Sequence, residues 1–152
     1  MKKIVLFSLF TVVLFVTACT NAEKKDNPLK AQADSLYKEV IAGHDMAMPK
    51  SMRIPKLQKA AQHMIDSIAV LPEKARQAAA HLKAKLEELV NELGDADNAM
   101  NIWMSEINFD SAINNLEQRI KYFTEEKIKV NKVKEAVLNS IAKADSLLKA
   151  KL

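Results

Sequence analysis

Long, nearly uninterrupted helical periodicity constrains this chain more than any other feature. Apolar residues recur at three- and four-residue steps from about position 29 to the C-terminus, the spacing that places side chains on one face of an α-helix. The 152 residues include only two glycines and four prolines, which is few for the many turns of a sheet protein. The sequence therefore predicts an all-α fold.

Three long helical stretches are separated by turn signals. The first runs from about Leu29 to Val70, the second from Pro72 to about Ile107, and the third from an N-cap at Asp110 to the C-terminus. At 1.5 Å per residue they span about 60, 52 and 60 Å. Three rods of similar length joined by short turns favour an elongated antiparallel bundle.

Prolines and a glycine predict where the rods bend. Pro49 and Pro55 each remove a backbone donor in the first stretch, so we expect a kink there, with Pro55 in the first turn of the new segment. Gly94 has the position of a helix C-terminus, and Asp95 suits the cap of a short continuation. If either point were a full reversal, the fold would be a shorter bundle of four or five helices.

The N-terminus carries a separate signal about location. Two lysines at positions 2 and 3 precede an apolar run over residues 4–16 and the sequence Val16-Thr17-Ala18-Cys19. The run is shorter than the roughly 20 residues of a spanning helix, and the whole pattern is that of a secretory signal. The last four residues resemble the lipobox of bacterial lipoproteins. This resemblance implies cleavage after residue 18 and lipid attachment to Cys19, the chain's only cysteine.

Three segments follow from these patterns: a signal peptide at 1–18, a lipidated flexible tether at 19–28 and a helical bundle domain at 29–152. Thr20, rather than an aspartate, follows the cysteine and favours an outer membrane. We therefore expect a lipid-anchored protein of the cell envelope, outside the cytoplasm. Removing Lys2 and Lys3 lowers the net charge from +4 to +2, too mild to predict a nucleic-acid partner.

Helical rise brings one set of residues to a similar height in the predicted bundle, beside the Pro49 kink. The set combines thioether, imidazole and aromatic groups: His44, Met48, Met100, Trp103, Met104, Tyr122 and Phe123. One interpretation is core packing, because methionine fills irregular gaps and favours aromatic neighbours. The other is a site for Cu(I) or haem, bound by imidazole and thioether groups. The candidate ligands of that site are His44, Met48, Met100 and Met104.

Motifs of enzyme chemistry are absent from the sequence, which has no His-Glu-x-x-His, Glu-x-x-His, Gly-rich phosphate loop or Gly-x-Ser-x-Gly. Asp110-Ser111 fits a helix cap better than a nucleophile, and Glu125-Glu126 fits a surface pair. We therefore expect that the protein is not an enzyme and binds no cofactor, and that it has a structural or protein-interaction role. Lys127 and Lys134 interrupt the third apolar stripe, which favours a looser middle. The chain could form a homodimer through residues 127–134, or its long polar faces could bind a partner coiled coil. A Cu(I)- or haem-binding envelope protein is the alternative.

Two patches carry a resemblance to a family. Residues 44–50 read His-Asp-Met-Ala-Met-Pro-Lys, and residues 97–104 read Asp-Asn-Ala-Met-Asn-Ile-Trp-Met. With the lysine-rich final helix, they resemble small bacterial helical lipoproteins often labelled "viral A-type inclusion protein". The likeness covers most of the mature chain, and the label implies no particular activity. The two patches that carry this resemblance are the same two that helical rise brings together in the predicted bundle.

Overall fold

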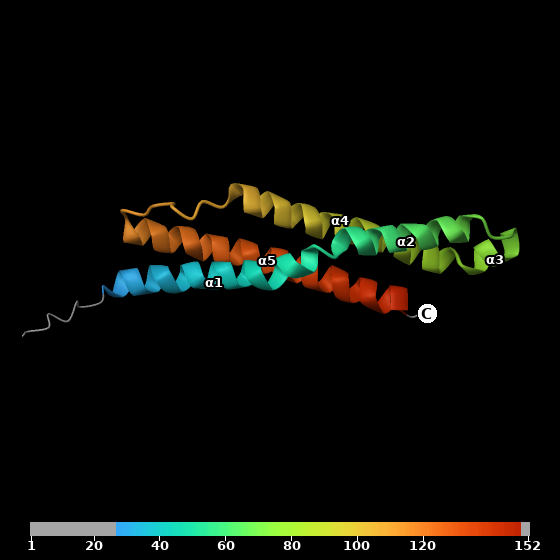
Figure 1. Ribbon diagram of the computed structural model, residues 1–152, viewed down its shortest axis with the longest axis horizontal. Coiled ribbons are helices and arrows are strands. Elements are labelled where there is room, and N and C mark those ends of the chain that lie inside the picture. The colour runs from blue at the N-terminus through green and yellow to red at the C-terminus, as the bar shows by residue number, and fades with distance from the viewer. Residues whose placement is uncertain (1–26, 150–152) are drawn as a thin grey trace, which may run out of the picture.

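The computed structural model describes residues 27–149, and within that range every regular element is a helix. The elements are α1 (Pro28–Ser51), α2 (Ile54–Ala69), α3 (Glu73–Ala78), α4 (Ala80–Glu106) and α5 (Leu116–Lys149). The predicted all-α class is confirmed. The helices lie along one long axis (Figure 1). The predicted signal peptide at 1–18, Cys19 and most of the tether lie outside the described residues.

A break between α1 and α2 lets this part of the chain change neighbours. Pro49 lies in the last turn of α1 and Pro55 in the first turn of α2, with Met52 and Arg53 between the two helices. The helix therefore breaks where the two prolines predict, since proline cannot donate to the helical ladder. α1 packs mainly on α5, whereas α2 packs mainly on α4. The Arg53 guanidinium ties the break to α5 through Asp145, with an N···O distance of 2.8 Å.

α4 continues without interruption through Gly94, so the helix end predicted there is wrong. Leu93 and Ala96, on either side of the glycine, are buried. Their packing outweighs the penalty of about 1 kcal/mol that glycine carries inside a helix. The discontinuity of this rod lies instead at Ala79, between the six-residue α3 and α4.

The connection from α4 to α5 is longer than the short turn predicted. Residues 107–115 form irregular turns before α5 begins at Leu116. The Asn115 side chain accepts a hydrogen bond from the Gln118 backbone N–H at 3.0 Å, which is the geometry of an N-cap. The prediction of Asp110 as the cap is therefore wrong, because the chain turns into the helix five residues later.

The same loop is tied to α5 by Arg119. Its Nη1 donates to the carbonyl oxygens of Phe109 at 3.1 Å and Ser111 at 2.9 Å. Ala112 has a φ of 52°, a left-handed conformation that is unfavourable for a residue with a Cβ atom. Ile113, the next residue, begins the apolar spacing of the third predicted stretch, which predicts that it faces inward. It is 58% exposed, so that prediction is wrong.

The core draws on all four long helices. Its largest fully buried side chains are Phe123, Ile54, Leu86, Leu89, Leu93, Met100, Val40, Val130 and Val137. α5 contributes a buried seam at three- and four-residue steps, which includes Phe123, Glu126, Val130, Val133 and Val137. This seam passes Lys127 and Lys134 without a gap, so the looser middle predicted from those two lysines is wrong.

Close approach of α1 and α5 depends on Gly43. A Cβ atom at this position would lie 3.0 Å from Val130 Cγ1, closer than ordinary van der Waals contact. Beside this contact, Lys127 forms an ion pair with Glu39 of α1. The hydrogen bond from Lys127 holds the pKa of Glu39 below its ordinary value. Lys127, which interrupts the apolar stripe of the sequence, therefore bridges two helices.

Candidate functional site

An aromatic cluster lies where α1, the end of α4 and the start of α5 meet. Its rings make two sets of contacts: Tyr37 with Phe109 and Phe123, and Phe123 with Tyr122, form one, and His44 with Trp103 forms the other. The two sets meet at a surface cleft that Phe109, His44 and Trp103 line together. The Tyr37 ring centroid lies 5.5 Å from that of Phe123 and 5.8 Å from that of Phe109, both edge to face. The sequence prediction for this region included Trp103 but omitted Tyr37 and Phe109.

Trp103 and Glu126 make the buried polar contact of the cluster. Each residue is 4% exposed, and the indole Nε1–H donates to Glu126 Oε2 at 3.0 Å. Lys129 Nζ donates to the other carboxylate oxygen at 2.7 Å, and this bond raises the pKa of Lys129 above its ordinary value. Burying a carboxylate is costly unless it is paired. Because both oxygens have partners, Glu126 anchors the indole, and its prediction as a surface residue is wrong.

The burial of Glu126 could have been predicted from the spacing of apolar residues in the sequence. It stands three residues after Phe123 and four before Val130, on the same helical face as both. The pair Glu125-Glu126 resembles a solvated charge run, and only Glu125 is exposed. The seam spacing, rather than the residue type, indicated burial.

Tyr122 and Phe123 connect the cluster to the 107–115 loop. The Tyr122 hydroxyl accepts a hydrogen bond from the Asn108 backbone N–H at 2.7 Å. The Arg119 guanidinium lies over the Phe123 ring, 4.7 Å from its centroid, within the range of a cation–π contact. The loop is thus positioned by polar contacts from the first turns of α5.

His44 forms the accessible edge of the cluster. Its ring centroid lies 5.7 Å from that of Trp103, and its Nδ1 lies 2.9 Å from Asp45 Oδ1. These residues line a surface cleft of about 370 Å³, together with Ile41, Met104, Ile107 and Phe109. The cleft can offer apolar contact and ring stacking, with one imidazole at its edge.

The four predicted metal ligands occupy different settings. His44 and Met104 line this cleft, and Met100 is buried in the core. The Met48 sulfur accepts a hydrogen bond from Ser51 Oγ at 3.6 Å. Within residues 27–149, no group of three or more His, Cys, Asp or Glu side chains is arranged to hold a metal ion. That observation does not concern thioethers, so the Cu(I) or haem site stays a prediction beside the core interpretation.

Comparison of the chain with protein-family models, curated proteins and solved structures finds no match. The likeness to helical lipoproteins therefore stays an expectation from the sequence. None of the described helices combines the length and the apolar character of a bilayer-crossing segment.

Proposed function

We propose that the chain is a membrane-tethered envelope lipoprotein whose helical body has a non-enzymatic structural or protein-interaction role. The observation that carries the proposal is the position of α1, whose first residues follow the predicted anchor segment and lie at one end of the long axis (Figure 1). An anchor at the end of a rod leaves its long faces accessible to other proteins. α5 alone has 34 residues and is about 51 Å long.

The architecture we propose is an antiparallel bundle of three rods, formed by α1 with α2, α3 with α4, and α5. The packing of α1 on α5, α2 on α4 and α4 on α5 supports it. Ion pairs on its surface suit a solvated body, such as Lys143 with Glu92 at 2.7 Å. The hydrogen bond to Glu92 raises the pKa of Lys143 above its ordinary value.

A homodimer contact at residues 127–134 belongs to this proposal. A shallow groove there is lined by residues of α1 and α5, including Met46, Lys127 and Lys134. Met46 and Ile128 are each more than half exposed. If the contact forms, Ile128→Glu should lower the mass of the detergent-solubilised complex in sedimentation. Ile102→Glu, on α4, is the matched control; equal masses for all three proteins would exclude this contact.

The anchor is tested on the full precursor expressed in a bacterium. The expected result is a mature protein that begins at Cys19, carries acyl chains by mass spectrometry and sediments with membranes. Cys19→Ala should abolish the acylation and the cleavage. An unmodified Cys19 in the unaltered chain would refute the proposal.

The second candidate is Cu(I) or haem binding, supported by the shared position of His44 and Met104 on the cleft beside Trp103. Anaerobic titration with Cu(I), and separately with haem, would follow Trp103 fluorescence. Stoichiometric quenching that is lost in both His44→Ala and Met104→Leu would support this candidate. Binding no tighter than micromolar would exclude it and leave these residues as packing.

A further inference from the structure

The end of the helical body where α1 begins is also the end nearest the proposed anchor. Asn27 lies eight residues after Cys19, a distance that a fully extended chain spans in at most about 28 Å. The 107–115 loop and the first turn of α5 lie at the same end (Figure 1). We call this surface the tether end. If Cys19 is acylated, the tether end stays within that distance of the bilayer.

The tether end exposes apolar side chains from two segments. Leu29, in the first turn of α1, is 38% exposed, and Ile113, three residues before α5, is 58% exposed. Phe109, further along the loop, is 37% exposed while its ring contacts Tyr37. Single exposed apolar residues are common on proteins. Here the loop itself presents Ile113, because Ala112 has a left-handed backbone and Arg119 holds the carbonyls of Phe109 and Ser111.

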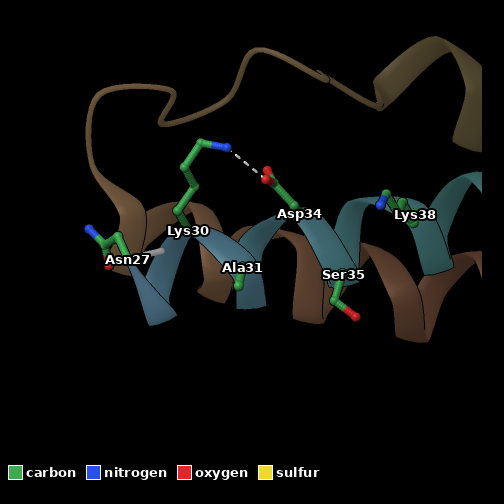
Figure 2. Close-up of a pocket in the computed structure, with 6 residues that line it drawn as sticks. All are labelled: Asn27, Lys30, Ala31, Asp34, Ser35 and Lys38. Carbon is green, nitrogen blue, oxygen red and sulfur yellow. Dashed lines mark hydrogen bonds and ion pairs between the residues drawn. The ribbon is translucent and has the colours of Figure 1, made fainter. Parts of the chain in front are cut away.

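Charge at the tether end is balanced rather than basic. Figure 2 shows the first turns of α1, where Lys30 forms an ion pair with Asp34 at 2.9 Å. This bond holds the pKa of Asp34 below its ordinary value. Arg119 is directed at the loop carbonyls. Exposed Lys38 of α1 and Lys121 of α5 are offset by exposed Asp110 and Glu117. Contact at this end is therefore suited to the apolar boundary of a bilayer and not to a specifically anionic surface.

We propose that the tether end rests on the membrane that carries the anchor, with Leu29 and Ile113 inserted at the boundary between headgroups and acyl chains. The inference rests on the lipid anchor of the proposed function and adds the orientation of the body. The opposite end provides a natural comparison, since Val70 is 83% exposed at the turn between α2 and α3. The exposure of apolar side chains alone would favour membrane contact at that opposite end, whereas attachment through Cys19 favours membrane contact at the tether end.

The experiment uses the full lipidated chain in phosphatidylcholine vesicles that contain brominated acyl chains. Because Cys19 is the only cysteine and its thiol is consumed by lipid, one introduced cysteine is a unique labelling site. Asn114→Cys places a fluorophore beside Ile113, and Ala69→Cys places it at the opposite end; both positions are exposed. We expect quenching at position 114 to be at least about three-fold greater than at position 69.

Two further variants of the Asn114→Cys protein test whether Ile113 and Leu29 cause the quenching at position 114. Ile113→Ser and Leu29→Ser should each lower the quenching about two-fold or more, because each removes apolar area from the contact without opening the core. Anionic lipid should leave the quenching within about two-fold; a larger rise would overturn the apolar contact in favour of an electrostatic one.

The outcomes separate this inference from the proposal on which it rests. Equal quenching at positions 114 and 69 in a vesicle-bound chain would overturn the orientation and leave the anchor intact. Reaction of the fluorophore with Cys19 in the unaltered chain would show a free thiol, which refutes the anchor and this inference together.

Discussion

The hydrogen bond between Trp103 and Glu126 should couple α4 to α5 by an amount that a double-mutant cycle can measure. Both residues are buried, and the bond is 3.0 Å long. Trp103→Phe keeps an aromatic ring but removes the donor. Glu126→Leu keeps most of the side-chain volume but leaves the indole N–H without an acceptor. The double variant removes both polar partners at once.

The expected magnitudes follow from burial. A hydrogen bond to a charged group contributes roughly 1.5–3 kcal/mol. Trp103→Phe should lower the free energy of unfolding by about 2–3 kcal/mol, because a buried carboxylate loses its donor and a smaller ring leaves space. Glu126→Leu should lower it by about 1–2 kcal/mol. Lys129 is largely exposed and can rehydrate, so the loss of its ion pair adds little.

The assay is urea unfolding at neutral pH, followed by far-ultraviolet circular dichroism so that every variant keeps its signal. The double variant should be more stable than additivity predicts by about 1.5–2 kcal/mol, with unchanged denaturant slopes. A coupling energy below about 0.5 kcal/mol would refute the reasoning, since it would mean that the buried carboxylate does not depend on the indole.

Three further predictions concern single positions. Asn115→Ala should destabilise the protein by about 1 kcal/mol in urea unfolding, because α5 loses its N-cap. As the control, Asp110→Ala should change the free energy of unfolding by less than about 0.5 kcal/mol. Equal effects of the two substitutions would contradict the assignment of Asn115 as the cap. Gly94→Ala should stabilise the chain by about 0.5–1 kcal/mol through its higher helix propensity. The nearest atom to the new Cβ is Gln58 Nε2 at 3.2 Å, the end of a side chain that can shift slightly while it donates to the Val90 carbonyl. A loss of stability would show that this hydrogen bond holds the amide in place. The pKa of Glu39 is lower in the folded protein than its ordinary value of 4.5. Its ion pair with Lys127 therefore stabilises the fold fully above pH 4.5, and this contribution is lost as the pH falls through the pKa of the folded state. Lys127→Met should return that pKa, measured by NMR titration, toward 4.5, and an unchanged pKa would exclude the Lys127 contact as its cause.

The sequence predicted the helices well because their main determinants are local. The apolar residues that recur at three- and four-residue steps in α4 and α5 include buried ones such as Leu86 and Val137. Pro49 and Pro55 identified the break between α1 and α2, because a missing backbone donor acts whatever surrounds it. These features depend on few neighbours, so one chain read alone reveals them.

The errors arose where tertiary packing outweighed a local preference. Gly94 carries a helix penalty, but burial on either side keeps α4 continuous. Asp110 is a good capping residue, yet the loop closes on Arg119 and Tyr122 and moves the helix start to Leu116. Glu126 is charged, but its partner Trp103 is 23 residues away, beyond the reach of a local pattern.

The candidate site was predicted less completely than the fold. Helical rise placed Trp103, Tyr122 and Phe123 in one layer of the bundle. The Tyr122 and Phe123 rings are in contact, and Trp103 bonds to Glu126, one turn further along α5. Rise gives height along the rod but not the direction of a side chain. Met100 therefore lies in the core while Met104, one turn later, lines the cleft.

The change of neighbours between α1 and α2 has a consequence for the order of folding. α2 and α4 are close in the chain and can pair soon after both exist, whereas α1 packs mainly on α5, at the far end of the sequence. Closing the longer loop costs more entropy, so the contact between α1 and α5 should form last. Until then, Val40 and Ala47 of α1 stay uncovered, which leaves this helix open to aggregation. Pulsed hydrogen exchange during refolding should show α2 and α4 amides protected before those of α1, and the reverse order would contradict this sequence of events.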